Sequence, residues 1–452
     1  MSANTLGGGR DTVCLFGNIG TGHLSGMLAL AERLTRSGWT VLFYAHAKAR
    51  ERVAATGAQW RNYGSDDWDL FSSARRATRE RLGLTPDPLL DMSIVASALP
   101  AALDMLPYLL AEIERHRPRF TVHDAAATWG ALAARLSGCP AVCSMSAFPL
   151  HAEEAAGTYP PGEIQEAAAR DLFERYGVHY DPKTAYTNYT DCNLVFTTAH
   201  WASHRRADVH RYCGPAPVVR PADAMEHPAV VAASAARAAG KKVAYASFGT
   251  VISGTLNAYY EPAMHHIFTE VIGALRGRDD VQLILSSGRG GVGTPAEHSA
   301  MPGTGEALPD FVRWFEYTPQ PEVLEHTDAF VTHAGMNSTN EAAWFGVPVI
   351  ACPFFGDGIV NARRFAELGA GINIDYRIAT PFEVMTGRRP FSTDAVPPVA
   401  MRSAFHAVLD DPSYRHAALA LRTVFRTEAD FDAAIAEMLE WVASRNAHVH
   451  QS

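Results

Sequence analysis

A glycine-rich segment near the start of the chain carries the first residue that could do chemistry. The segment GNIGTGHLSG spans residues 17–26, follows the apolar run VCLF and holds His23. It does not match the dinucleotide-binding pattern G-x-G-x-x-G, and no acidic residue closes the next apolar run, VLFYAHAK, as that pattern requires. An imidazole titrates near neutral pH, so we interpret His23 as a general base that activates a hydroxyl group.

A general base needs a partner that fixes its tautomer, and Asp124 is the candidate for that role. Asp124 ends the apolar run FTVHDA in the same half of the chain. Alternation along a strand points the neighbouring His123 to the opposite face, so we interpret His123 as structural. Plainer roles stay open, because His23 could bond to backbone at a helix start and Asp124 could cap a helix.

The second half of the chain carries a pattern typical of phosphate binding. In residues 331–362 an apolar run ends at VTHAG, and a helical pattern begins near Asn337. The N-terminus of a helix has unpaired N–H groups and a partial positive charge, which favour a phosphate. The hydroxyls of Ser338 and Thr339 and the imidazole of His333 would add hydrogen-bond donors.

Further polar and aromatic groups stand at the ends of neighbouring apolar runs. The segment SFGT (247–250) offers more N–H groups and hydroxyls, and Glu341 suits a ribose diol. Tyr317 and Gln320 follow another run, where an aromatic ring could stack on a base. Taken singly, each could be a cap, a core residue or a loop residue. Their order along one half of the chain favours a nucleotide site.

Composition excludes several classes of protein. The chain has 452 residues and a net charge of −9, which argues against a nucleic-acid-binding protein. Its six cysteines form no CxxC pair, its nineteen histidines form no HExxH pattern, and we expect reduced thiols and no metal site. The first residues lack an apolar signal core, and no apolar stretch reaches the roughly 18 residues of a membrane span. We therefore expect a cytoplasmic protein without a membrane span.

Strand-like and helix-like segments alternate through both halves, which predicts two doubly wound α/β domains with parallel sheets. A proline-rich stretch at 212–242 predicts the connection between them. We predict an N-terminal domain over 1–220 and a C-terminal domain over 221–425. The amphipathic helix within 426–452 is expected to pack back on the N-terminal domain. Ligands of such sheets bind at the carboxyl ends of the strands, so we expect the site in an interdomain cleft.

The segments YTPQPEVL and THAGMNST make the chain resemble the family 1 nucleotide-sugar-dependent glycosyltransferases, in their bacterial macrolide-glycosyltransferase branch. The resemblance covers nearly the whole chain and implies the GT-B fold, with two facing Rossmann-like domains. It implies that His23 is the general base and Asp124 its partner, and that the anomeric configuration inverts without a metal ion. The donor-binding positions that it implies are Thr250, Tyr317, Thr318, Gln320, His333, Gly335, Asn337, Ser338, Thr339, Glu341 and Asp357.

The resemblance also divides these positions by the part of the donor that they contact. Tyr317 would stack on the base of a UDP- or TDP-sugar, and Gln320 and Glu341 would bind the ribose. The diphosphate would be held by His333, Ser338, Thr339 and Thr250. Asp357 would bind sugar hydroxyls. No cofactor is expected, because the nucleotide sugar acts as a co-substrate.

One position departs from the family pattern. Where the family commonly has an acid followed by glutamine, this chain has Asp357 followed by Gly358. Glycine cannot supply an amide to sugar hydroxyls. Either another residue replaces that contact, or the donor sugar lacks or inverts a hydroxyl, as in a deoxysugar carried by TDP.

The acceptor is less well defined by the sequence. Segments 66–95 and 144–151 are expected to line its pocket, through the apolar side chains Trp68, Phe71, Met92 and Phe148. They favour a polyketide, macrolide or aromatic acceptor, although all four could equally be core residues. The stretch 376–398 has no match in the family pattern. Biosynthetic tailoring and inactivation of an antibiotic are both compatible with such an enzyme.

Two other functions remain open at this point. A nucleotide-sugar epimerase of the same fold would direct acid and base groups at the sugar ring. A non-catalytic nucleotide-sugar binder or auxiliary protein would not need both His23 and Asp124. In every case the expected partners are a nucleotide sugar and a small molecule, with no nucleic acid, and the chain is expected to be a monomer or a homodimer.

Overall fold

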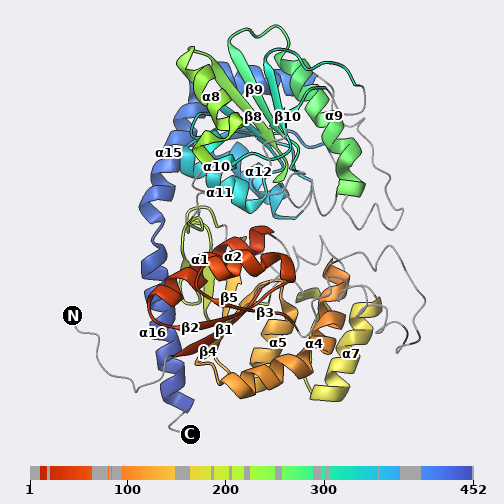
Figure 1. Cartoon of the computed structure of the whole chain (residues 1–452), viewed down its shortest axis with the longest axis vertical. Helices are drawn as coiled ribbons and strands as arrows, with labels where there is room; N and C mark the ends of the chain where they lie inside the picture. The colour runs from red at the N-terminus through yellow and green to blue at the C-terminus, as the bar shows by residue number, and fades with distance from the viewer. Residues whose placement is uncertain are drawn as a thin grey trace, which may run out of the picture. The chain divides into compact units, whose positions relative to one another are not determined.

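The computed structural model describes residues 11–17, 21–63, 80, 83, 94–147, 163–184, 188–202, 206–217, 224–249, 257–288, 297–300, 305–354, 356–376 and 399–449. The chain divides into two compact units. The N-terminal unit comprises residues 1–217 and 430–452, and the C-terminal unit comprises residues 218–429. Each unit is built on its own seven-stranded sheet (Figure 1).

The sheet of the N-terminal unit is parallel throughout, with the strand order β3-β2-β1-β4-β5-β6-β7. Its strands are β1 (Thr12–Phe16), β2 (Thr40–Tyr44), β3 (Gln59–Arg61), β4 (Phe120–Asp124), β5 (Ala141–Met145), β6 (Asn193–Val195) and β7 (His210–Tyr212). The chain reverses its direction across the sheet between β3 and β4. The loops after β1 and β4 therefore leave the sheet side by side, at the carboxyl ends of paired strands.

Helices cover both faces of this sheet. They are α1 (Thr21–Arg36), α2 (Arg50–Ala55), α4 (Ile94–His116), α5 (Thr128–Ser137), α7 (Glu163–Tyr176) and α16 (Phe431–Val449), with short 3-10 turns η1 (Ala47–Ala49) and η3 (Pro182–Thr184). One core lies between the sheet and α1, α2 and α16, and the other lies under α4, α5 and α7. Burial of apolar side chains on both faces gives the strands their nearly continuous apolar sequences.

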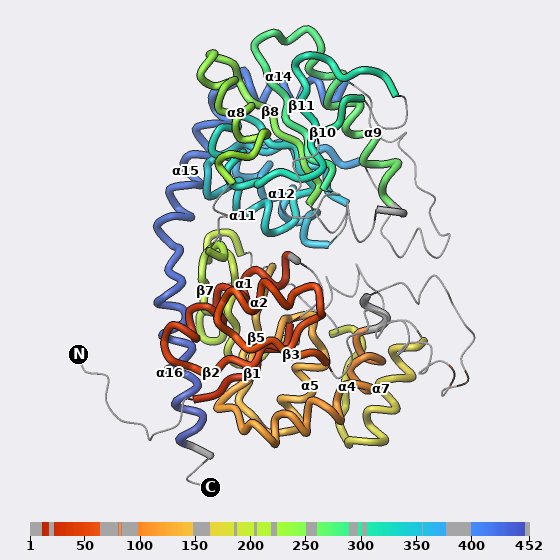
Figure 2. Tube along the Cα trace, in the orientation of Figure 1, coloured from red at the N-terminus to blue at the C-terminus, as the bar shows by residue number. Residues whose placement is uncertain are grey.

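Helix α16 belongs to the N-terminal unit, although it is the last helix of the chain (Figure 2). Its buried side chains Ile435, Met438 and Val442 join the core that contains α1. The helix lies against β6 and β7, and Asn446 donates a hydrogen bond of 3.1 Å to the carbonyl of Arg119. The amphipathic pattern near the C-terminus therefore reflects packing against a sheet formed much earlier in the chain.

The C-terminal unit repeats the architecture with the strand order β10-β11-β9-β8-β12-β13-β14, and only β10 is antiparallel to its neighbour. The strands are β8 (Lys242–Ser247), β9 (Val281–Ser286), β10 (Glu297–His298), β11 (Val312–Phe315), β12 (Ala329–Thr332), β13 (Val349–Ala351) and β14 (Gly371–Asn373). Its reversal point lies between β8 and β12, whose carboxyl ends carry the segments SFG and HAG.

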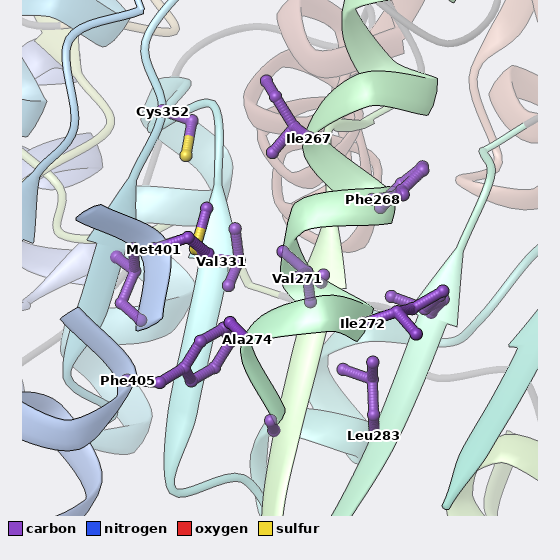
Figure 3. Close-up of a cluster of buried hydrophobic side chains, with 14 of the residues drawn as sticks. Ile267, Phe268, Val271, Ile272, Ala274, Leu283, Val331, Cys352, Met401 and Phe405 are labelled. Carbon is purple, nitrogen blue, oxygen red and sulfur yellow. The ribbon is translucent and has the colours of Figure 1, made fainter. Parts of the chain in front are cut away.

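The helices of this unit also lie on both faces of the sheet. They are α8 (Pro228–Ala238), α9 (Asn257–Leu275), α10 (Gln320–Leu324), α11 (Met336–Phe345), α12 (Asp357–Glu367), α14 (Val399–Asp410) and α15 (Pro412–Glu428), with the short turn η4 (Ala224–Glu226). Helices α9 and α14 share the main core with the sheet. Figure 3 shows Val271 of α9 and Phe405 of α14 among the side chains that fill it, close to Val331 of β12.

The predicted fold class is confirmed, because both units have the parallel, doubly wound α/β arrangement. The sequence pattern did not anticipate the short strands β3, β7 and β10, since two or three residues are too few to show a period. Residues Trp68, Phe71, Met92, Phe148 and Thr250 lie outside the described residues, and so does the stretch 376–398 except for Tyr376, which is buried. No described helix is both long enough and apolar enough to cross a membrane.

Candidate active site

The candidate base and its partner are placed by strand alternation in the N-terminal unit. In β4, Phe120 and Val122 point into the core beneath α1, and Asp124 continues the same face at the end of the strand. In β5, Val142 lies on this face as well, paired with Val122. His123 lies on the other face, as predicted. It is buried, and its Nε2 lies 2.8 Å from the carbonyl oxygen of Asn188.

His23 lies in the first turn of α1, above the end of β4. Its Nδ1 is 3.0 Å from both carboxylate oxygens of Asp124. The Asp124 side chain is completely buried, whereas the His23 side chain is 34% exposed. The two residues are 101 positions apart in the sequence, and the predicted pairing of their side chains is present in the structure.

Asp124 also accepts a hydrogen bond of 2.9 Å from the backbone N–H of Ala126. This bond lies in the turn before α5 and not at the helix end, because the N-cap of α5 is Ala127, which makes no side-chain cap. A buried carboxylate requires hydrogen-bond donors, and the Nδ1–H of His23 is one of them. With the proton on Nδ1, the lone pair of His23 is on Nε2, where it can accept a proton.

Two residues around the segment 17–23 were missed by the sequence interpretation. The Oγ of Ser146 lies 3.0 Å from the Nδ1 of His23. The hydroxyl of Tyr63 lies 2.7 Å from the carbonyl oxygen of Gly17 and ties the start of the glycine-rich segment to the sheet. Ser146 could have been found, because it follows Val142 at even spacing on the face that carries Asp124.

In the C-terminal unit, the loop after β12 leads into α11. Gly335 is the N-cap of α11 and makes no side-chain cap, so backbone N–H groups are available there. Ala334 has a left-handed backbone with φ 60°, which is rare for a residue with a side chain. The carbonyl of Ala334 accepts hydrogen bonds from the Thr339 hydroxyl at 3.1 Å and from Asn361 at 2.8 Å, and both bonds hold the loop in shape.

His333 is packed tightly between two glycines. A Cβ on Gly249 would lie 2.9 Å from the His333 ring, and a Cβ on Gly335 would overlap the ring. Burial lowers the pKa of His333 to about 4, so the ring is neutral near pH 7. Its Nδ1 is buried and has no hydrogen-bond partner among the described residues. A neutral ring with an unpaired nitrogen can donate a hydrogen bond without carrying a charge.

Gln320 links the other predicted donor-binding positions. Its amide donates hydrogen bonds to Glu341 at 2.6 Å and to the hydroxyl of Ser338 at 3.1 Å. Burial raises the pKa of Glu341 to about 7, although the bond from Gln320 favours the ionised form. The hydroxyl of Tyr245, which the sequence interpretation missed, lies 2.7 Å from that of Thr318. These side chains form one polar group at the start of α10 and α11.

Three predicted positions flank this group. Tyr317 is partly buried, and its ring meets the ring of His227 edge-on, with centroids 6.3 Å apart. Asn337 is partly buried in the first turn of α11. The carboxylate of Asp357 accepts a hydrogen bond of 2.9 Å from the N–H of Met336, the first residue of α11.

The structure explains the glycine that departs from the family pattern. Gly358 lies in the first turn of α12, and a Cβ there would lie 2.6 Å from the carbonyl oxygen of His333. The preceding Gly356 has φ 63° and ψ −138°, a backbone that favours glycine. The two glycines let the start of α12 contact the His333 loop directly, so no side chain fits at position 358.

Among the described side chains, no group of three or more His, Cys, Asp and Glu residues is arranged to hold a metal ion. The described groups are an imidazole–carboxylate pair in the N-terminal unit and a set of backbone and side-chain donors in the C-terminal unit. The first can accept a proton, and the second can bind an anion and a diol.

Comparisons with known proteins find glycosyltransferases. The chain is 27% identical over 375 residues to an uncharacterized UDP-glucosyltransferase, YdhE, of Bacillus subtilis (strain 168), covering 80% of this chain and 85% of that protein. It is 26% identical to the demethyllactenocin mycarosyltransferase of Streptomyces fradiae, over 77% of this chain and 72% of the relative. The crystal structure of the glycosyltransferase of kitacinnamycin superimposes with a TM-score of 0.67 at 22% identity, covering 96% and 100% of the two chains.

Two Rossmann-like units of this topology define the GT-B class of glycosyltransferases. Residues 237–434 match the family model described as "UDP-glucoronosyl and UDP-glucosyl transferase". The chain is a glycosyltransferase that is similar to this family over these residues, and the resemblance inferred from its motifs is confirmed.

Proposed function

We propose that the protein is an inverting glycosyltransferase that moves a sugar from a UDP- or TDP-sugar to a hydroxyl of a small, largely apolar natural product. The observation that carries the mechanism is the pair formed by His23 and the buried Asp124, with Nδ1 3.0 Å from each carboxylate oxygen. This contact supports a base that holds a proton on Nδ1 and accepts a second proton on Nε2. The similarity to proteins named as glycosyltransferases supports the transfer of a sugar.

The proposed reaction begins at the acceptor hydroxyl. Its proton moves to Nε2 of His23 while its oxygen forms a bond to the anomeric carbon of the sugar. The bond between that carbon and the diphosphate oxygen breaks with its electron pair on the diphosphate. Attack opposite to the leaving group inverts the anomeric configuration. Asp124 stabilises the imidazolium that forms, because it holds the Nδ1–H against a buried negative charge.

The C-terminal unit would bind the donor and stabilise the leaving group. The N-terminus of α11 offers N–H groups to the diphosphate, and the neutral His333 adds a donor with an unpaired buried nitrogen. The carboxyl group of Glu341, joined to Gln320, suits a ribose diol. These donors would stabilise the negative charge of the leaving diphosphate, as a metal ion does in other transferases. We therefore propose a metal-independent reaction.

The sugar and the acceptor are proposed only as classes. One relative is named a UDP-glucosyltransferase and another a mycarosyltransferase, so the sugars of the relatives differ. The contact between Gly358 and the His333 loop excludes a glutamine at that position, which supports a donor other than plain glucose. Relatives named for demethyllactenocin and kitacinnamycin support a natural-product acceptor.

A two-stage experiment tests the proposal. A panel of UDP- and TDP-sugars is first screened for protection against thermal unfolding, since a ligand that binds the native state raises the melting temperature. Donors that bind are then incubated with polyketide and aromatic acceptors, and the products are analysed by mass spectrometry. A transferase adds the mass of a sugar to the acceptor. A donor isomerised without change of mass would indicate an epimerase, and binding without any product would indicate a non-catalytic protein.

A further inference from the structure

Ser146 contacts the same nitrogen of His23 as Asp124 does, which is unusual because that nitrogen carries only one proton. The distances from Nδ1 are 3.0 Å to Oγ of Ser146 and 3.0 Å to each carboxylate oxygen of Asp124. Three oxygens therefore surround one ring nitrogen. Ser146 immediately follows β5 and is partly buried.

The fold places these oxygens together for a simple reason. Strands β4 and β5 are parallel neighbours, with Asp124 opposite Ser144 in the register. Side chains at even spacing share a face, so Ser146 lies one pleat beyond Ser144 on the face that carries Asp124. Helix α1 packs against β4 and β5 and brings His23 to the end of both strands.

Two arrangements of protons are chemically possible at this cluster. If Ser146 donated its hydrogen to Nδ1, that nitrogen would carry a lone pair and would face two carboxylate oxygens at 3.0 Å. A lone pair opposite a buried carboxylate is repulsive, and the carboxylate would lose the hydrogen bond that the N–H donates to it. If Nδ1 carries the proton, Asp124 and Ser146 can both accept it, and the hydrogen of Ser146 points elsewhere.

We infer that Ser146 is a positioning residue that accepts the Nδ1–H of His23 together with Asp124 and holds the ring in its basic tautomer. This inference rests on the proposed role of His23 as the general base. Asp124 supplies the charge, and Ser146 adds an acceptor just beyond β5, so the ring is held from the ends of two neighbouring strands. The imidazolium formed during transfer keeps the same two partners, because its Nδ1–H does not move.

The experiment compares Ser146→Ala with Ser146→Thr and Ser144→Ala. Ser146→Ala removes the oxygen, and Ser146→Thr keeps it. Ser144→Ala is the matched control, because Ser144 lies on the same face one pleat earlier and its buried hydroxyl has no hydrogen-bond partner among the described residues. We expect kcat to fall about three- to tenfold in Ser146→Ala, the loss of one hydrogen bond. Ser146→Thr should keep most of the rate, and Ser144→Ala should keep all of it.

A second measurement reads the tautomer without relying on activity. Protein labelled with ¹⁵N-histidine is studied by NMR, and the His23 signals are assigned by their loss in His23→Ala. In the native protein and in Ser144→Ala we expect the proton on Nδ1 and the lone pair on Nε2. In Ser146→Ala a larger share of the Nε2–H tautomer should appear. An unchanged spectrum, or a larger share of Nδ1–H, would overturn the inference.

A double-mutant cycle separates this inference from the proposed function. If Ser146 acts through His23, Ser146→Ala should cost nothing in a His23→Ala background. An equal loss in both backgrounds would overturn the inference, because Ser146 would then act elsewhere in the site. Full activity of His23→Ala would instead contradict the proposed mechanism, and the NMR experiment would still decide what Ser146 does.

Discussion

The two candidate sites each contain a histidine at the carboxyl end of a strand, and the surroundings of the two rings are opposite. His23 is 34% exposed and pairs with a completely buried carboxylate. His333 is packed between Gly249 and Gly335, and burial lowers its pKa to about 4. The second ring is therefore neutral near pH 7, whereas the first lies beside a carboxylate that would stabilise a proton on it. The same side chain thus suits a base in one unit and a neutral hydrogen-bond donor in the other.

The comparison also separates two ways of building a site. In the N-terminal unit the contacts are between side chains from α1, β4 and the end of β5. In the C-terminal unit the backbone contributes more, since glycines allow loops to approach closely and the N-cap of α11, Gly335, makes no side-chain cap. Substitutions should therefore act on catalysis in the first unit and on donor binding in the second.

The largest effect is expected for His23→Ala. Loss of a general base should lower kcat by about 10²–10⁴-fold, because the acceptor would lose the side chain proposed to take its proton. Binding of the nucleotide sugar, measured as a shift in melting temperature, should not change. His179→Ala, an exposed histidine of the same unit, is the control. Weaker donor binding with unchanged kcat would contradict the division between the two sites.

The next largest effect is expected for Asp124→Asn, which should lower kcat by about 10²-fold. The amide keeps the shape of the side chain but removes the charge that stabilises the imidazolium, and its NH₂ group favours the wrong tautomer. The measurement is single-turnover kinetics with saturating donor. Asp181→Asn, a carboxylate of the same unit far from His23 in the chain, should behave as wild type. A rate close to wild type in Asp124→Asn would show that the carboxylate only supports the fold.

Gly335→Ala tests the C-terminal unit. The added methyl group would overlap the His333 ring and push it out of position. We expect the donor KM to rise about tenfold or more, as for the loss of one or two hydrogen bonds to a charged ligand, with a smaller change in kcat. Gly273→Ala is the matched control, because a Cβ there meets no atom within 4 Å and alanine is favoured in helix α9. An unchanged KM in Gly335→Ala would show that the position of His333 does not affect binding of the diphosphate.

A smaller effect is expected from pH, through Glu341. Its pKa is about 7, raised from 4.5 by burial, so the group is largely protonated at pH 6 and ionised at pH 8. The ionised carboxylate can accept hydrogen bonds from both hydroxyls of a ribose. Donor affinity, measured by calorimetry without acceptor, should therefore rise as the pH increases through 7.

Glu341→Gln should remove this dependence, and Glu367→Gln, an exposed acid on α12, should keep it. The raised pKa of Glu341 also predicts that the stability of the fold changes with pH in the opposite direction to donor affinity. Because the folded-state pKa is raised, the native protein binds the proton more tightly than the unfolded chain does. Stability attributable to Glu341 should therefore decrease as the pH rises from 4.5 to 7. A flat affinity profile in the native protein would contradict the ribose role.

The smallest effect is expected from metal chelation. If the α11 N-terminus and His333 stabilise the leaving diphosphate, EDTA should leave kcat and the donor KM unchanged. Initial rates are measured with and without EDTA, and again after addition of Mg²⁺ or Mn²⁺. Activity that is lost in EDTA and restored by either ion would contradict the proposed metal independence.

Much of the fold followed from local sequence patterns. The apolar runs and the helical spacing that follows each of them predicted two parallel α/β sheets, because a strand buried on both faces needs a continuous apolar sequence. Helix α11 was predicted from Asn337 and begins at Met336, since a helix end depends on backbone conformation that side-chain types indicate only loosely. The positions of His23 and Asp124 at strand ends were also visible, and so was the family resemblance.

Only the tertiary structure decided how these residues meet. His23 and Asp124 are 101 residues apart and Ser146 is a further 22 beyond Asp124, so their contact depends on the register of β4 and β5 and on the packing of α1. The raised pKa of Glu341 and the lowered pKa of His333 come from burial, which no local pattern encodes. The fit of Gly358 against His333 depends on two loops that approach within contact distance. Local sequence determines the elements and the chemical groups, and long-range packing determines distance and solvation, on which their chemistry depends.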